Sequence, residues 1–239
     1  MIAITFALPT ESVGVLAAVR DRREEGGIVY GKLANRDVAI FHTGVGRKAC
    51  QLAMERFLPT LQPSLLISAG FAGGIDEKLC VGDRFVAENF SDAALLEFLH
   101  PAFQQTTLDR GKLFTASSVI DSPEARDRIA RENGASAVDM ETEVIALACH
   151  ERGIRLLSIR AISDTSGELF PLPPSILFDI ERQTTRSGRL IWYLITHPAA
   201  IPRLLRFASQ IKKARRGLTA DIYAFVYVLG DPDNKIVRQ

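Results

Sequence analysis

Two carboxylates stand where a catalytic site of an α/β protein is expected. Asp164 follows the apolar run 154–162, and Glu141 follows the short β-prone stretch 137–139 at the start of a helical pattern. In open α/β sheets, ligands bind beyond the carboxyl ends of the strands, so polar side chains at strand ends are candidates for chemistry. We therefore examine these two residues as a pair.

The surroundings of the two carboxyls favour different protonation states. Apolar neighbours disfavour a charge, so we expect Asp164 to hold a proton and to act as a general acid. Glu141 starts a helix, whose dipole favours an anion that can accept hydrogen bonds from ligand hydroxyls. Structural alternatives stay open for both residues, because Asp is a common helix cap and Glu commonly matches a helix start.

Two further strand ends carry residues of interest. The first apolar run, 1–8, ends close to Glu11, and the run 64–69 ends in a glycine-rich turn, 70–74. These glycines shape a pocket or only allow close packing. Arg160 lies inside an apolar strand, where its charge needs a partner such as Asp164 or a backbone oxygen. The four histidines show no ligand spacing, so we expect no metal site.

The elements that carry these residues alternate between β-prone and helical patterns. β-prone runs lie at 1–8, 28–33, 37–42, 64–69, 84–87, 112–117, 137–139 and 154–162, and helical patterns at 49–58, 122–132 and 141–151. This alternation predicts an α/β protein: a single three-layer α/β/α domain with a central mixed, largely parallel sheet and a helical C-terminal segment. We expect the domain to cover 1–230, helical from about 175, and a loose tail at 231–239.

Bulk properties exclude several classes of function. The 29 basic and 28 acidic residues nearly cancel, so the chain offers no overall field that recruits nucleic acid. The three cysteines form no CxxC pair, which favours a reducing cytoplasm. We find neither a signal peptide nor an apolar run near the roughly 20 residues that span a bilayer. We expect a cytoplasmic protein with a small-molecule substrate.

The C-terminal segment combines basic and apolar residues. Its basic residues are Arg203, Arg206, Lys212, Lys213, Arg215 and Arg216, and its apolar ones Leu204, Leu205, Phe207 and Ile211. This composition is typical of a helix on a membrane surface, although a solvated basic face is the commoner outcome. Weak contact with a membrane surface therefore stays open.

Three motifs resemble those of the nucleoside phosphorylase and nucleosidase superfamily. They are the turn at Ser68–Gly74, the sequence Val138-Asp139-Met140-Glu141, and the strand Ile159–Asp164. The superfamily includes purine nucleoside phosphorylases and methylthioadenosine/adenosylhomocysteine nucleosidases. The resemblance covers about residues 1–165 and looks closest to hopanoid-associated phosphorylases, which are thought to remove adenine from an adenosyl lipid.

The resemblance implies cleavage of the N-glycosidic bond of an adenine-type nucleoside. Asp164 would protonate N7 of the base, Glu141 would bind the ribose, and Glu11 would position the attacking water. The other residues that it places in the substrate site are Met140, Phe71, Ala72, Gly73, Val119, Ile120 and Arg160. A non-catalytic nucleoside-binding module and a membrane-surface scaffold are the alternatives.

Three positions depart from the family pattern and bear on the nucleophile. Asp139 replaces a Glu, Phe71 replaces a Ser or Thr, and Ser68 stands where phosphorylases keep a phosphate-binding arginine. Water is therefore favoured over phosphate, although Gly46 and Arg47 could still contact phosphate as a co-substrate. We expect no other cofactor.

The resemblance also implies that the protein forms a homo-oligomer and that its substrate carries a lipid group at the ribose 5′ carbon. The segment 165–178 includes the apolar residues Leu169, Phe170, Leu172, Leu177 and Phe178, which could admit a lipid substituent at the ribose 5′ carbon.

Overall fold

The protein is built around one large mixed sheet. The computed structural model describes residues 1–104, 108–168, 178–179, 184–185, 193, 196–197 and 200–229. The sheet strands are β1 (Ile2–Phe6), β2 (Arg20–Glu25), β3 (Ile28–Leu33), β4 (Arg36–His42), β5 (Leu65–Gly74), β6 (Arg84–Ala87), β7 (Leu108–Gly111), β8 (Leu113–Thr115), β9 (Ala137–Asp139) and β10 (Arg155–Asp164). A separate short pair consists of β11 (Phe178–Asp179) and β12 (Thr184–Thr185).

The centre of the sheet is parallel and its margins are mixed. The main strand order is β2-β3-β4-β1-β5-β10-β6-β7, and β9 pairs with the end of β5 and with β8. Strands β4, β1, β5 and β10 are all parallel, whereas β2, β3 and β6 join as antiparallel neighbours. This confirms the expected mixed, largely parallel sheet, and the four parallel strands end at one common edge.

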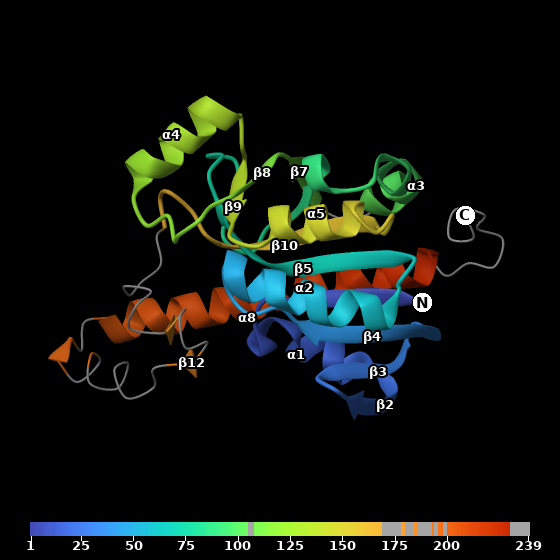
Figure 1. Ribbon diagram of the computed structural model, residues 1–239. Coiled ribbons are helices and arrows are strands. Elements are labelled where there is room, and N and C mark those ends of the chain that lie inside the picture. Colours follow the sequence, from blue (N-terminus) through green and yellow to red (C-terminus); the bar gives the residue numbers. More distant parts are fainter. Residues whose placement is uncertain are drawn as a thin grey trace.

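Helices cover both faces of the sheet and complete three layers. They are α1 (Pro9–Ala18), α2 (Arg47–Leu61), α3 (Ala93–Gln104), α4 (Pro123–Asn133), α5 (Thr142–His150) and α8 (Ile201–Leu229), with a 3-10 turn η1 at Glu88–Phe90. Along β5, Leu65 and Ile67 join a core with α1, α3 and α8, while Leu66 joins a core with α2 and α5. Figure 1 shows the long α8 running beneath β5, with α5 on the other side. Alternate side chains of this apolar strand therefore pack into two separate cores, one on each face of the sheet.

Local sequence explains where the site-bearing helices begin. The side chain of Ser122 accepts a hydrogen bond from Ala125 N, as expected of the cap of α4. Gly46 precedes α2 with φ of 87°, a left-handed conformation that glycine adopts without strain. Helix α5 begins at Thr142, so Glu141 is its N-cap residue and not its first residue.

Two elements were not expected from sequence. Strand β2 is entirely exposed and charged, and it holds its place through backbone pairing with β3 at the sheet edge. Charged side chains on an edge strand discourage pairing with another chain, so the missing apolar pattern fits the position. Helix α3 lies between the expected runs 84–87 and 112–117, where we expected no element, and it buries Leu95 and Leu99 in the core with α8.

Some expectations fall outside the described residues. These are the apolar residues Leu169, Phe170, Leu172 and Leu177, the side chain of Phe178, and the tail 231–239. Within the described part of the chain, no helix is long and apolar enough to cross a bilayer.

The packing of α8 predicts a strong contrast between two aromatic residues of this helix. Phe225 is 1% exposed in the core, whereas Tyr227 is 66% exposed. We expect Phe225→Ala to lower the free energy of unfolding by about 3–5 kcal/mol through loss of buried contacts. Tyr227→Ala should change it by about 0.5 kcal/mol or less. Urea unfolding of both variants measures this, and equal losses would show that α8 is not packed as described.

Candidate active site

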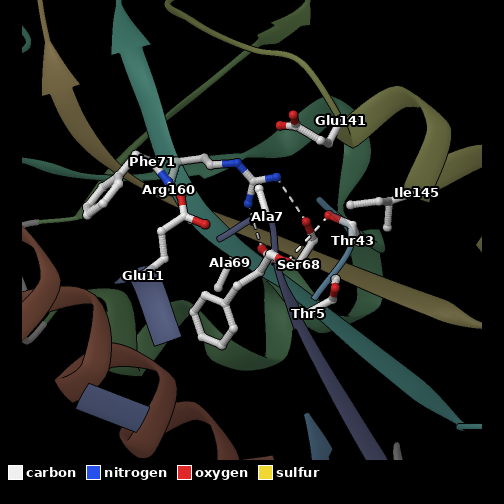
Figure 2. A pocket seen from close by; sticks show the side chains of 12 residues that line it. Thr5, Ala7, Glu11, Thr43, Ser68, Ala69, Phe71, Glu141, Ile145 and Arg160 are labelled. Carbon is white, nitrogen blue, oxygen red and sulfur yellow. Dashed lines mark hydrogen bonds between the residues drawn. The ribbon is translucent and has the colours of Figure 1, made fainter. Parts of the chain in front are cut away.

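A small cavity opens at the shared edge of the parallel strands. Its walls come from β1, β5 and β10 together with α1, α5 and the segment after β4 (Figure 2). The lining residues are Thr5, Phe6, Ala7, Glu11, Thr43, Ser68, Ala69, Gly70, Phe71, Glu141, Ile145 and Arg160. Four of the residues expected in the site therefore line one cavity: Glu11, Phe71, Glu141 and Arg160.

Arg160 is the buried cation of this cavity, 3% exposed. Its guanidinium donates to Asp139 Oδ2 at 3.0 and 3.2 Å, to Ser68 O at 2.8 Å and to Ser68 Oγ at 2.9 Å. It also donates to the hydroxyl of Thr142. The carboxylate partner is Asp139, whereas the sequence suggested Asp164. Asp139 ends β9 and lies within hydrogen-bond distance of Nε and Nη2 of Arg160. Asp139 thus neutralises Arg160 within the site.

Glu11 reaches the cavity from the first turn of α1. Its carboxylate accepts hydrogen bonds from Leu8 N at 2.8 Å and Phe71 N at 2.9 Å. A Cβ on Gly70 would lie 3.0 Å from Glu11 Oε1, so the glycine allows this close approach. Burial raises the pKa of Glu11, and the two backbone hydrogen bonds oppose that rise.

Glu141 reaches the cavity from the start of α5. Its Oε1 accepts a hydrogen bond from Gly46 N at 2.6 Å. Burial, followed by the nearby Asp139 carboxylate, raises the pKa of Glu141 to about 8. Desolvation and the carboxylate neighbours thus oppose the helix dipole, which we expected to favour the Glu141 anion. Figure 2 shows Glu11 and Glu141 on either side of Arg160.

Asp164 ends β10 and is not among the residues that line this cavity. Its Oδ1 accepts a hydrogen bond from Ser163 Oγ at 2.6 Å, and its Oδ2 forms an ion pair with Arg126 Nη2. The apolar neighbours that we expected around Asp164 are therefore joined by a buried cation, Arg126. Sequence reasoning missed Arg126, because an arginine in the polar helix α4 is indistinguishable from its solvated neighbours.

Gly73 lies between the strand that carries Asp164 and the strand that leads to Glu141. It pairs with Asp164 on β10 and with Val138 on β9. Neighbouring strands lie about 4.8 Å apart, so Asp164 and Val138 flank Gly73 with their Cα atoms roughly 10 Å apart. Glu141 follows Val138 by three residues. The acid candidate and the cavity therefore belong to one edge of the sheet.

The remaining candidates lie around these groups. Ile120 O accepts hydrogen bonds from Arg126, and Ala72 O accepts one from Ser163 Oγ at 3.2 Å. Met140 is half-buried beside Glu141, and Val119 is exposed.

The two groups suggested for phosphate both have carboxylate partners. Gly46 N donates to Glu141, and Arg47 forms an ion pair with Glu143. In the described ranges of the chain, no group of three or more His, Cys, Asp or Glu residues could hold a metal ion.

Comparison with known proteins places the chain in a family. The profile of the Phosphorylase superfamily matches residues 2–109 and 91–196. Together these matches cover most of the chain, so the protein belongs to the Phosphorylase superfamily.

Nucleosidases are among the similar proteins. A 5'-methylthioadenosine/S-adenosylhomocysteine nucleosidase of Staphylococcus aureus (strain MRSA252) is 28% identical over 162 residues, which are 56% of this chain and 71% of the relative. The solved Streptococcus pneumoniae enzyme of that name, bound to a transition-state inhibitor, superposes with a TM-score of 0.73 at 20% identity, covering 95% of this chain and 99% of its own. Futalosine hydrolase of Helicobacter pylori gives 0.69 at 17% identity, covering 94% and 96%. These structures share the fold.

The raised pKa of Glu141 predicts that its charge opposes folding at high pH. An unfolded glutamate ionises at its ordinary pKa, so the folded state holds the extra proton between about pH 4.5 and pH 8. Stability from this group is fully present below pH 4.5 and is lost as pH rises through 8. We expect Glu141→Gln to gain stability relative to the wild type, on the order of 2 kcal/mol between pH 5 and pH 8.

Thermal unfolding across this pH range measures the gain. Glu143→Gln is the matched control, because Glu143 is an exposed residue of the same helix. A stability difference for Glu141→Gln that does not change with pH would contradict the assignment.

Proposed function

We propose that this chain hydrolyses the N-glycosidic bond of adenine nucleosides. The observation that carries the proposal is the juxtaposition of Glu11 and Glu141 in one cavity, with Asp164 at the neighbouring strand end. Membership of the Phosphorylase superfamily supports a nucleoside substrate. The similar methylthioadenosine/adenosylhomocysteine nucleosidases support an adenine base.

Each carboxyl has a separate task in the proposed reaction. Glu141 accepts hydrogen bonds from the ribose hydroxyls and orients the sugar. Asp164 gives its proton to N7 of the purine while the C1′–N9 bond breaks and its electron pair stays on the base. Glu11 orients the water and takes its proton as the oxygen joins C1′. Met140, Phe71, Ala72, Gly73, Val119 and Ile120 surround the substrate in this proposal.

The charges of the cavity favour water over phosphate. Arg160 is neutralised by Asp139, and Arg47 by Glu143. The Gly46 N–H, which could otherwise donate to an anion, is used by Glu141. A phosphate dianion would therefore enter a space lined by two further carboxyl groups without an uncommitted cation among these residues. A neutral water molecule carries no such penalty.

The proposal extends to the assembly, the location and the substrate of the protein. We propose a homo-oligomer, a cytoplasmic location and one catalytic unit over 1–230. A lipid substituent at the ribose 5′ carbon, as in hopanoid-associated phosphorylases, fits the apolar sequence 165–178.

A surface role for α8 rests on a specific observation. Residues 201–213 include no buried side chain, whereas the second half of the helix is anchored in the core. Exposed Ile201 and Leu205 accompany the basic side chains of this half. We propose that it makes weak contact with an anionic membrane surface. Binding to phosphatidylserine vesicles that falls with salt would support this, and absence of binding at low salt would contradict it.

Release of free adenine tests the proposed reaction directly. Adenosine, methylthioadenosine and an adenosyl lipid are incubated with the protein, with and without phosphate. We expect adenine in phosphate-free buffer, because water is the nucleophile. Release only with phosphate would identify a phosphorylase, and no release from any of them under either condition would contradict the proposal.

Substitution of the acid and the base separates their roles from folding. Asp164→Asn and Glu11→Gln should each lower kcat by about 10²–10⁴-fold, since neither amide can transfer the proton required of it. Circular dichroism should show both variants folded. Asp121→Asn is the control, because Asp121 is exposed beside α4. Near wild-type activity of Asp164→Asn would remove the proposed mechanism.

The pH dependence of kcat/KM follows from the buried carboxyls. Glu11 must be ionised to accept a proton from water, and Glu141 accepts hydroxyl hydrogen bonds best as an anion. Because burial raises the pKa of both, with that of Glu141 at about 8, kcat/KM should rise between pH 6 and pH 8. Initial rates at subsaturating substrate measure this. An acid limb near pH 4.5 would show that neither raised pKa governs the free enzyme.

A further inference from the structure

Arg126 is a buried arginine on an otherwise polar helix. It is 3% exposed, although α4 as a whole buries no other residue. Its Nε and Nη2 donate to Ile120 O at 3.3 and 3.1 Å, and its Nη1 donates to Gly74 O at 3.0 Å. Nη2 also contacts Asp164 Oδ2. The guanidinium therefore joins α4, the segment before it, and the ends of β5 and β10.

The partners of Arg126 divide into two kinds. Ile120 and Gly74 provide carbonyl oxygens, which fix the direction of the guanidinium but carry no net charge. Asp164 provides a carboxyl oxygen, and it is the partner that can balance the buried positive charge once its proton has left. Because the carbonyl contacts do not depend on the charge of Asp164, they hold the guanidinium in place in either protonation state of the acid.

Gly73 makes this arrangement possible. A Cβ at this position would lie 3.2 Å from Arg126 Nη2 and 3.3 Å from Nη1. A side chain on Gly73 would therefore push the guanidinium away from Asp164. Gly73 lies on strand β5, as does Gly70, which makes room for Glu11.

We propose that Arg126 is a positioning residue for the acid Asp164 and that it stabilises the carboxylate left after proton transfer. The inference rests on the proposed function. When the Asp164 proton moves to N7 and the electron pair of the C1′–N9 bond stays on the base, the negative charge left on Asp164 develops beside a cation that is already in place. A preorganised cation at the site of a developing charge lowers the barrier without moving during the reaction.

The alternative is that Arg126 only holds the fold together. A purely structural arginine would affect stability, and any loss of rate on its removal would be independent of Asp164. A positioning residue acts through Asp164, so its removal should matter only while the acid is present. A double-mutant cycle distinguishes the two roles.

The experiment measures adenine release by Arg126→Met, Arg126→Lys, Asp164→Asn and the double variant Arg126→Met/Asp164→Asn. Arg126→Met should lower kcat by about 10–10²-fold, with KM changed by less than about threefold. Arg126→Lys keeps the charge and should recover part of the rate. In the Asp164→Asn background, Arg126→Met should cost less than about threefold further. Arg128→Met is the control, because Arg128 is an exposed residue of α4.

The outcomes separate this inference from the proposed function. If the wild type releases adenine and Asp164→Asn releases it more slowly, an equal fold loss of rate from Arg126→Met in both backgrounds would overturn the inference and leave the function intact. An unchanged kcat for Arg126→Met would overturn it too. If the wild type releases no base, the proposed function fails and the inference fails with it. Thermal unfolding shows whether each variant is folded. If Arg126→Met does not fold, Arg126→Lys replaces it in the cycle.

Discussion

The buried ion pair between Arg160 and Asp139 is the interaction on which the rest of the site depends. Both side chains are almost fully buried. A charge in such a place is tolerated only when a partner and hydrogen bonds replace the water that it has lost. Arg160 meets that condition by bonding to β5 through Ser68 and to α5 through Thr142. One guanidinium thereby links three neighbouring strands and a helix.

This pair also decides where Glu141 lies and how it behaves. Asp139 ends β9 and accepts a hydrogen bond from Thr142 N at the start of α5. Glu141 lies between these two residues in the chain, so the hydrogen bond restricts its position. Burial, followed by the carboxylates of Asp139 and Glu11, raises the pKa of Glu141. The hydrogen bond from Gly46 and the charge of Arg160 oppose that rise without cancelling it. The same constraint leaves the cavity better suited to a neutral nucleophile than to an anion.

A second buried arginine, Arg126, is also paired with a carboxyl group, that of Asp164. Arg126 and Asp164 come from distant parts of the chain and meet where β5 ends. The glycine-rich segment Gly70–Gly74, expected as a turn, instead continues strand β5. It has a steric role at two points: Gly70 admits the Glu11 carboxyl, and Gly73 admits the Arg126 guanidinium. This end of β5 shapes the space in which charged groups approach each other.

The amino-acid sequence by itself determined the α/β class, the parallel centre of the sheet and the strand ends at which Glu11, Glu141 and Asp164 lie. These follow from local patterns, because apolar runs and glycine turns reflect the secondary structure of the residues that contain them. Only the tertiary structure decided which arginine pairs with which carboxyl group. Arg160 binds Asp139 and not Asp164, the Arg126 side chain is buried beside Asp164 although its helix is polar, and burial raises the pKa of Glu141 at the start of a helix. Ion pairing and desolvation depend on groups brought together from distant parts of the chain, and the local pattern of any one segment contains no record of them.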